Sequence, residues 1–320
     1  MALHGWIILD KPVGLGSTQA VGAVKRALRE SGEPKTKVGH GGTLDPLASG
    51  VLPIALGEAT KLCGRMLDAT KAYDFTIRFG EETDTLDLEG TVAATSDVRP
   101  ALSEVQAVLK RFTGPIDQVP PAFSALRIEG ERAYDLARAG KEVELEARRV
   151  TIHSLSIRHP ELDSGSISPP TNASLECILN QVQHDGLAEV TLSAAVSKGT
   201  YIRSLARDIA HSLNTVGHVT MLRRTKAGPF GLDRAISLDF LQDAAKARRL
   251  TETVLPLDAG LDDIPGLPVT PEQAQLLRQG QRLFGIPAMP GLQIAMDGKV
   301  PVALVEVSDD GCKVVRGFNL

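Results

Sequence analysis

Cysteine is scarce in this chain, which has three in 320 residues. Cys63, Cys177 and Cys312 lie far apart, and no two of them have a CxxC spacing. An odd number of cysteines without a metal-ligand spacing is not the pattern of a disulfide framework or of a zinc site. We therefore interpret all three as structural thiols and expect no metal.

Long apolar runs are also missing. No stretch approaches the roughly 20 apolar residues that a membrane span requires. The first ten residues lack the basic segment and long apolar run of a secretory signal. Hydrophobic residues make up 42% of the chain and charged residues 23%, which is typical of a globular protein with a core. We expect a cytoplasmic protein without membrane contact, built from one large domain and one small one.

An excess of positive charge is absent as well, because the formal net charge is −4. Taken alone, this charge speaks weakly against binding to nucleic acid, since lysine and arginine neutralise phosphates. Residues 198–226, however, contain six lysines and arginines against the single acid Asp208. Such a segment fits either an RNA-binding groove or a solvated helix face, and composition leaves both interpretations open.

Periodicity predicts alternating strands and helices over the first 255 residues. We expect strands at residues 6–9, 73–79 and 190–196, and helices at residues 17–31, 102–112, 132–139 and 202–213. Ser17 is expected to cap the first helix, and Gly114 to close the second. One-sided alternation in the strands indicates a largely antiparallel sheet with one wet face.

The last 65 residues have a different pattern. Residues 256–268 are rich in proline and aspartate and are interpreted as a linker. Thr270 and Gln273 have the spacing of a capping box around Pro271. Strands are expected at residues 292–296, 300–307 and 312–318. We therefore divide the chain into a domain at residues 1–255 and a small, mostly β domain at residues 256–320 that packs on it.

Asp45 is the strongest candidate for chemistry. It lies in the segment GHGGTLDPLASGVLPIALGEATK, residues 39–61, between two adjacent glycines and Gly50. Glycines allow close backbone approach, and Pro46 restricts Asp45 to an extended conformation. A carboxylate presented on such a loop is a candidate nucleophile or base. Spacing alone favours a plainer alternative, a turn aspartate that bonds its own backbone.

Several motifs along the chain resemble those of the TruB family of pseudouridine synthases. The string GTLDPLASGVLPIALGEATK resembles the catalytic loop of that family. Further similar strings follow in family order: DKPVGLGS at residues 10–17, KAY at 71–73, FGEETDTLD at 79–87, PPAFSA at 120–125, RAY at 132–134, SKGTYIRSL at 197–205 and LRRT at 222–225. The matches cover about residues 5 to 240.

The resemblance implies an α/β (α+β) pseudouridine-synthase fold with a mixed, largely antiparallel sheet and a catalytic cleft. It also implies an RNA-gripping insert at about residues 120–150 and a C-terminal PUA-like RNA-binding domain. The implied activity is isomerisation of uridine 55 in the T-loop of tRNA to pseudouridine. That reaction is redox neutral, so no cofactor is expected. The base must be extruded from its RNA loop before it is attacked, and whether the attack falls on the sugar or on the base stays open.

Site residues are carried over position by position. Asp45 matches the nucleophile, Tyr73 the aromatic residue that stacks on the base, and Arg203 the partner of the catalytic carboxylate. His40 matches a residue that supports the flipped loop, and Tyr201 and Leu222 match positions that line the pocket. The expected phosphate contacts are Lys11, Lys61, Lys198, Arg223 and Arg224. Without the motifs, Tyr73 and Leu222 would be read as core residues and the cations as ordinary surface charges.

Three functions remain open at this point. The first is a stand-alone synthase that acts as a monomer on the T-arm of tRNA without a protein partner. The second is a non-catalytic RNA binder or folding chaperone, which would not need Asp45. The third is a synthase that depends on a guide RNA. The segment at residues 132–149 resembles the bacterial tRNA-gripping insert and favours the first.

Overall fold

The computed structural model describes residues 3–124, 126–128, 130–141, 143–158 and 186–320. Cys177 lies outside these ranges, as do residues 159–173, whose serines, glycine and paired prolines predict an exposed loop. The chain forms two compact units. The first contains Met1–Pro46, Gly50–Asp68 and Lys226–Leu320, and the second contains Leu47–Ser49 and Ala69–Thr225. Within the described ranges, no helix is long and apolar enough to span a membrane.

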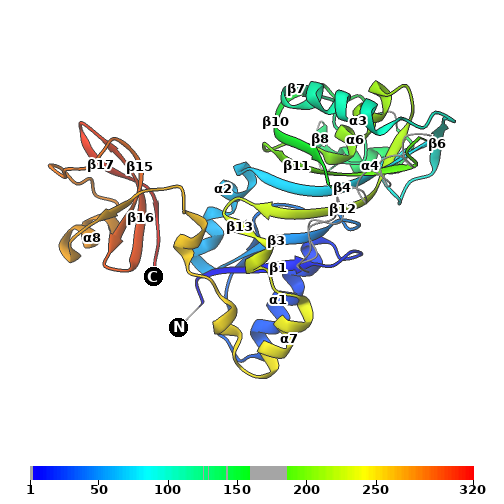
Figure 1. Cartoon of the computed structure of the whole chain (residues 1–320). Helices are drawn as coiled ribbons and strands as arrows, with labels where there is room; N and C mark the ends of the chain where they lie inside the picture. The colour runs from blue at the N-terminus through cyan, green and yellow to red at the C-terminus, as the bar shows by residue number, and fades with distance from the viewer. Residues whose placement is uncertain (1–2, 125, 129, 142, 159–185) are drawn as a thin grey trace, which may run out of the picture. The chain divides into compact units, whose positions relative to one another are not determined.

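The first unit begins with three antiparallel strands. Strand β3 (Ser49–Leu56) pairs with β1 (Gly5–Lys11) in the register Ile7↔Ile54, and with β2 (Val38–His40). Helices α1 (Ser17–Glu30) and α7 (Leu238–Lys246) lie together against β1 and β3 (Figure 1). Leu9, Val24 and Leu241 are fully buried among these elements, in one apolar cluster. This packing fixes both ends of the segment that carries Asp45.

The C-terminal part of the first unit is a small, mostly β module, as expected. Its sheet runs β14 (Gly266–Pro268), β15 (Gly291–Asp297), β16 (Val300–Ser308), β17 (Gly311–Gly317), with a parallel first pair and antiparallel others. Helix α8 (Pro271–Arg278) has the expected capping box, because Thr270 Oγ1 accepts from the Gln273 N–H and Gln273 Oε1 accepts from the Thr270 N–H.

The expected linker at residues 256–268 is largely packed. It contains the 3₁₀ turn η6 (Leu257–Gly260), and Leu257, Leu261 and Ile264 are buried in the same apolar cluster as Trp6. Trp6 Nε1 donates to the Leu257 carbonyl at 3.0 Å. The linker prediction was therefore wrong for these residues, because apolar side chains between the prolines supply a core. The division of the chain after residue 255 stays a prediction.

The C-terminal tail is fastened to the 3₁₀ turn η1 (Gly57–Leu62). The Glu58 carboxylate accepts from Lys61 Nζ at 2.6 Å and from the Asn319 backbone N–H at 2.8 Å. Lys61 Nζ also donates to the Gly317 carbonyl at 2.9 Å. The chain continues from η1 into α2 (Cys63–Asp68), and returns to this unit through β13 (Phe230–Gly231), η4 (Leu232–Arg234) and, after α7, η5 (Leu250–Thr253).

The second unit is a twisted sheet covered by helices. Its neighbouring strands are β12 (Gly217–Ala227), β4 (Lys71–Phe79), β11 (Glu189–Val196), β10 (Arg148–Ile157) and β7 (Gly114–Gln118). Helices α3 (Leu102–Leu109) and α6 (Ile202–Ser212) pack on this sheet (Figure 1). Phe75, Ile77 and Leu205 are fully buried there.

Shorter elements complete the second unit. The turn η2 (Lys110–Phe112) follows α3, and the hairpin of β5 (Glu81–Thr83) and β6 (Val92–Thr95) follows β4. The expected insert at residues 120–150 contains the hairpin of β8 (Arg127–Ile128) and β9 (Glu131–Arg132), with α4 (Ala133–Arg138) after it. The α/β class and the largely antiparallel sheet are confirmed.

Two local predictions were wrong at helix ends. The N-cap of α1 is Gly16 rather than Ser17, and no side chain caps it by accepting from a backbone N–H. Instead, Gln19 Oε1 accepts from the Gly16 N–H at 2.8 Å. Gly114 has a φ of 101° but opens β7 instead of closing a helix, because η2 and Thr113 intervene. The face of β4 expected to be wet is also partly covered, since Asp74 and Thr76 are each 8% exposed.

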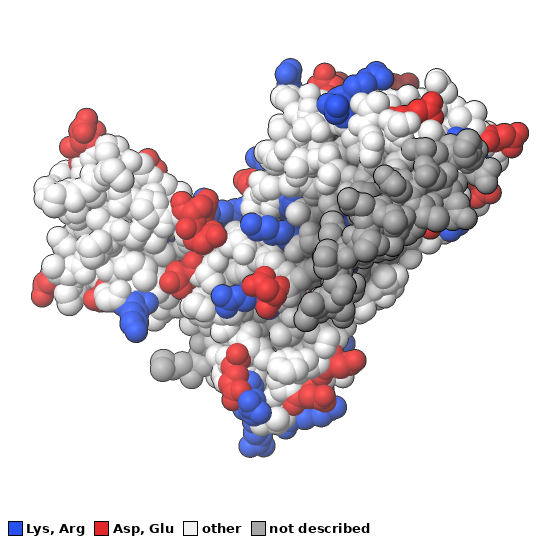
Figure 2. All heavy atoms as spheres, viewed as in Figure 1, with Lys and Arg blue, Asp and Glu red and all other residues white. Residues whose placement is uncertain are grey.

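The basic segment at residues 198–226 does not form one surface stripe. Arg203 is 7% exposed and Arg224 only 1%, and Arg207 pairs with Asp208 at 2.8 Å. On the face shown in Figure 2, lysines and arginines are interspersed with acidic side chains. The charge excess in the sequence therefore belongs partly to buried structural arginines.

Candidate functional site

Asp45 lies on the loop between β2 and β3, half-buried and flanked by the buried Leu44 and the exposed Pro46. Both neighbours are held through their backbone. Ser17 Oγ donates to the Leu44 carbonyl and accepts from the Leu44 N–H, each at 2.9 Å. The Pro46 carbonyl accepts from the Gly14 N–H at 2.8 Å. These bonds restrain the backbone on both sides of the half-buried Asp45.

The Lys11 side chain bonds to the backbone around the same loop and does not lie on the surface. Its side chain is fully buried, and Nζ donates to the carbonyls of Pro12, Leu15 and Pro46 at 2.9, 2.7 and 3.2 Å. These bonds offset the cost of burying an ammonium group. The expected phosphate contact at Lys11 is therefore corrected, because the amine is covered and turned toward the protein backbone.

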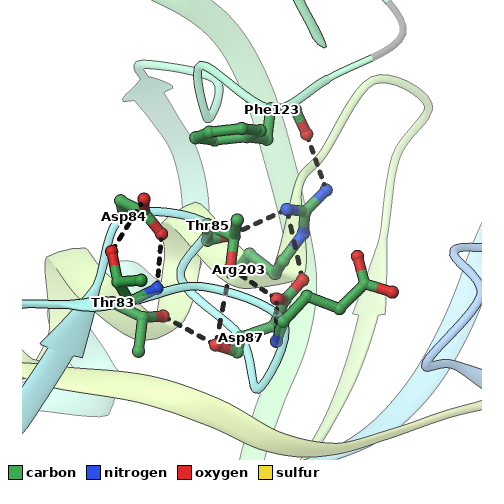
Figure 3. A network of polar contacts seen from close by, with 8 residues as sticks. Thr83, Asp84, Thr85, Asp87, Phe123 and Arg203 are labelled. Atoms are coloured by element: carbon green, nitrogen blue, oxygen red, sulfur yellow. Dashed lines mark hydrogen bonds and ion pairs between the residues drawn. The ribbon is translucent and has the colours of Figure 1, made fainter. Parts of the chain in front are cut away.

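A buried network surrounds Arg203 on α6 (Figure 3). Arg203 Nη1 donates to the Thr85 carbonyl at 2.8 Å and lies 3.3 Å from Asp87 Oδ2. Nη2 donates to the Phe123 carbonyl at 3.0 Å. The side chains of Arg203 and Asp87 are 8% and 12% exposed. A guanidinium group held by a carboxylate and two carbonyls has a fixed position and keeps its charge.

The loop that supplies Asp87 is itself internally bonded. Asp87 Oδ1 accepts from Thr85 Oγ1 at 2.6 Å and from the Glu89 N–H at 3.0 Å, and Thr83 Oγ1 donates to the Asp87 carbonyl at 2.7 Å. Leu86 has a φ of 62°, a left-handed conformation that is costly for a leucine. The loop is part of a motif that resembles the family, but that resemblance implied no role for Asp87. The one available signal for Asp87 was the TDTLD string, in which four side chains that can accept hydrogen bonds flank Leu86.

The segment after β7 is bonded to the beginning of α6. Gln118 Oε1 accepts from the Tyr201 N–H at 2.8 Å. Arg207 Nη2 donates to the Val119 carbonyl at 3.1 Å. Together with the Arg203 bond to Phe123, these contacts tie the base of the expected insert to the helix that carries Arg203. Tyr201 is the N-cap residue of α6 and is half-buried.

Tyr73 and Leu222 also lie in the second unit. Both are partly buried and pack against its apolar cluster, Tyr73 from β4 and Leu222 from β12. His40 lies in the first unit at the end of β2, and its Nδ1 accepts weakly from the Gly42 N–H at 3.4 Å. Asp45 and His40 thus belong to the first unit, and the other expected pocket residues to the second. The expected pairing of Arg203 with Asp45 stays a prediction.

The remaining expected phosphate contacts differ in accessibility. Lys198 is exposed and Arg223 is half-buried. Lys61 is half-buried, and its amine makes the contacts to Glu58 and Gly317 described above. Arg224 is almost fully buried and offers little surface to a phosphate. Lys198 and Arg223 are therefore the candidates that we retain for phosphate contact.

Thiol chemistry is not favoured at the described cysteines. Burial raises the pKa of the Cys63 thiol and of the Cys312 thiol above its ordinary value. Thiols with a raised pKa are poor nucleophiles at neutral pH. This agrees with the structural role expected for them.

Two curated proteins of high sequence identity share one name. The chain is similar to the curated tRNA pseudouridine synthase B of Novosphingobium aromaticivorans, with 62% identity over 99% of this chain and 98% of that protein. It is similar to the protein of the same name from Zymomonas mobilis, with 56% identity over 99% and 97%.

Solved structures show the same fold at lower identity. An H/ACA ribonucleoprotein bound to a substrate RNA containing 2'-deoxyuridine matches with a TM-score of 0.68 at 23% identity, over 99% of this chain and 86% of that one. The archaeal box H/ACA Nop10–Cbf5 complex matches with a TM-score of 0.67 at 23% identity and the same coverage.

Two family models cover most of the chain. The TruB family pseudouridylate synthase N-terminal domain matches residues 25–202, and the tRNA pseudouridylate synthase B C-terminal domain matches residues 203–262. The first match contains the loop of Asp45, the motif of Asp87 and the strand of Tyr73, and the second begins at Arg203. The chain therefore belongs to the TruB family of pseudouridylate synthases.

Proposed function

We propose that this protein is a tRNA pseudouridine synthase that isomerises uridine 55 in the T-loop, with Asp45 as its nucleophile. The observation that carries the proposal is the loop of Asp45, which lies inside the segment that matches the family. The neighbours of Asp45 in this loop, Leu44 and Pro46, are bonded to the buried Ser17 and Lys11. Relatives at 62% and 56% identity carry the name tRNA pseudouridine synthase B. Their names supply the substrate class.

The chemistry requires one bond to break and another to form. Asp45 attacks the extruded uridine, and the bond between base nitrogen 1 and sugar carbon 1′ breaks. The base turns and rejoins carbon 1′ through its carbon 5, and the bond that Asp45 formed to the substrate breaks, which restores the carboxylate. The proton on carbon 5 leaves to solvent, and base nitrogen 1 takes up a proton. No electrons are gained or lost, so the chain needs no redox partner for this step.

The other residues prepare this step. Tyr73 is proposed to stack on the base, a contact worth about 1–3 kcal/mol. Arg203 is proposed to pair with the Asp45 carboxylate and to orient it in the substrate complex. The Thr85 and Phe123 carbonyls and the Asp87 carboxylate hold its guanidinium group for that task. Tyr201 and Leu222 are proposed to line the base pocket, and His40 to support the open RNA loop.

Recognition of the RNA is proposed to rest on the T-arm. Lys198 and Arg223 are the retained phosphate contacts, and the insert at residues 120–150 and the PUA-like domain at residues 256–320 are proposed to extend the interface. We propose that the protein acts in the cytoplasm as a monomer, without a guide RNA or protein partner.

The test uses purified protein and two unmodified tRNA transcripts, one natural and one with cytidine at position 55. Digestion to nucleosides then measures pseudouridine. We expect about one equivalent from the natural transcript and none from the substituted one. Equal product from both would contradict the choice of position 55. No product from either, with binding retained, would favour the chaperone or guide-dependent alternative.

A further inference from the structure

The side chain of Ser17 is used for something other than capping its helix. Serine at a helix start commonly accepts from a backbone N–H of its own first turn. Here Ser17 is the first residue of α1, and its hydroxyl is bonded to Leu44, 27 residues away. The residue is 5% exposed, so solvent is not its partner.

The two bonds to Leu44 act on the peptide that leads into Asp45. The Leu44 carbonyl belongs to the peptide plane joining Leu44 to Asp45, and the hydroxyl of Ser17 donates to it at 2.9 Å. The Leu44 N–H belongs to the preceding plane and donates to the same hydroxyl at 2.9 Å. One side chain therefore restrains the backbone on both sides of Leu44.

The loop is restrained on the other side of Asp45 as well. The Pro46 carbonyl accepts from the Gly14 N–H at 2.8 Å and from Lys11 Nζ at 3.2 Å, and the proline ring fixes its own φ. With the peptides before and after it restrained, Asp45 has little freedom in the direction of its Cα–Cβ bond. All these contacts lie within the first unit.

We propose that Ser17 is a positioning residue for the Asp45 carboxylate, acting by fixing the Leu44–Asp45 peptide. The inference rests on the proposed function of Asp45. A small misplacement of a reacting group lowers a rate far more than it lowers binding. Ser17 should therefore affect the chemical step and not the affinity for RNA.

The experiment compares Ser17→Ala, which removes both bonds, with Ser17→Thr, which keeps a hydroxyl. Two variants on α1 serve as matched controls. Gln19→Ala removes the bond to the Gly16 N–H and so loosens the same helix end without touching Leu44. Ser31→Ala removes a buried hydroxyl at the other end of the helix, one that has no hydrogen-bond partner among the described residues.

Each variant is measured for two quantities: the single-turnover rate on tRNA transcript at saturating protein, and the dissociation constant of the complex. For Ser17→Ala we expect a rate about 10- to 100-fold lower and an affinity within about threefold of wild type. Ser17→Thr should recover most of the rate, and both controls should keep it. If Ser17→Ala does not fold at the assay temperature, Ser17→Cys, with its weaker hydrogen-bonding thiol, takes its place with the same expected direction.

A wild-type rate in Ser17→Ala would overturn the inference. So would an equal loss in Gln19→Ala, which would assign the effect to the helix end, or a loss of affinity at an unchanged rate. Asp45→Asn is run in parallel to separate two failures. If Asp45→Asn retains activity, the proposed function of Asp45 fails. If it is inactive while Ser17→Ala is fully active, only the role of Ser17 fails.

Discussion

Asp87 is the acidic partner of Arg203, a contact that the sequence motifs did not predict. Its carboxylate is nearly buried, 3.3 Å from the Arg203 guanidinium group, and also accepts from Thr85 Oγ1. Buried ion pairs add little net stability, yet breaking one leaves an uncompensated charge. Asp87 is therefore expected to matter chiefly because it compensates the buried charge of Arg203 and holds its guanidinium group in place.

We expect Asp87→Asn to lower the free energy of unfolding by roughly 3–5 kcal/mol, because the buried Arg203 loses its charged partner. Urea unfolding monitored by circular dichroism measures this difference. Asp84→Asn is the control in the same loop, since Asp84 is exposed and accepts only from Thr91 among the bonds described. Its effect should stay within about 1 kcal/mol. Equal effects of the two substitutions would contradict the importance of the Arg203 pair.

At the level of elements, η1 and the C-terminal tail are joined through Glu58. Burial pushes the pKa of the Glu58 carboxyl upward, but hydrogen bonds from Lys61 and the Asn319 N–H, with the charges of Lys61 and His4, lower this pKa overall. A carboxyl with a lowered pKa in the folded state stabilises the protein above its unfolded-state pKa. That contribution is lost as the pH falls through the folded-state pKa.

Glu58→Gln should therefore destabilise the protein in a pH-dependent way. At pH 7 we expect a loss of roughly 0.5–1.5 kcal/mol. The difference from wild type should shrink below about pH 4.3, the ordinary glutamate pKa, and disappear in stronger acid. Thermal unfolding across this range measures it. A difference that is constant with pH would show that the charge of Glu58 contributes nothing.

A second element contact concerns the beginning of α6. Gln118→Met keeps the side-chain length but removes the acceptor for the Tyr201 N–H. We expect a loss of roughly 1–2 kcal/mol, because a buried donor is left unsatisfied. Gln273→Met at the exposed start of α8 is the control, where water replaces the lost bond and the loss should be below 1 kcal/mol. A smaller loss at Gln118 than at Gln273 would contradict this role.

Periodicity predicted the elements whose pattern is simple. The alternating residues of β4 and β11 and the capping box of α8 lie where they were expected. Strand β3 was missed because Gly50 and Pro53 disguise a fully apolar run, although Pro53 pairs with Ile8 in its register. Strand β12 was missed because its two adjacent arginines resemble a solvated segment, while Arg224 is in fact buried.

For the candidate site, too, the sequence indicated some residues and missed the contacts of others. The motifs singled out Asp45, Tyr73 and Arg203 because their strings are long and specific, and the roles of these three residues stay predictions. The contacts of Lys11, Ser17 and Asp87 depend on residues far apart in sequence, and local spacing gives no measure of burial. In the sequence, a buried lysine cannot be distinguished from a surface lysine. The three carbonyls that accept from Lys11 Nζ are seen only in the structure.

For the whole molecule, we propose that a small number of accessible cations reconciles the net charge of −4 with RNA binding. Lys198 and Arg223 remain after the buried Lys11 and Arg224 are set aside. Their effect should be visible in the salt dependence of tRNA binding, because neutralising a phosphate releases counterions.

The logarithm of the tRNA affinity should fall linearly with the logarithm of salt concentration. Lys198→Ala is expected to make this slope shallower by roughly one unit, and Lys11→Met to leave the slope unchanged in whatever fraction of that variant folds. Filter binding over a range of salt concentrations measures both slopes. A shallower slope for Lys11→Met would contradict the assignment of Lys11 to the loop of Asp45.

The central claim is that Asp45 is the nucleophile. Its most direct test is tritium release from tRNA transcript labelled at carbon 5 of uridine, with wild type and Asp45→Asn side by side and the affinity of each measured separately. We expect about one equivalent released by wild type and none by Asp45→Asn, with the RNA affinity of the two proteins within several-fold of each other. Release by Asp45→Asn, or a loss of RNA binding that explains its inactivity, would contradict it.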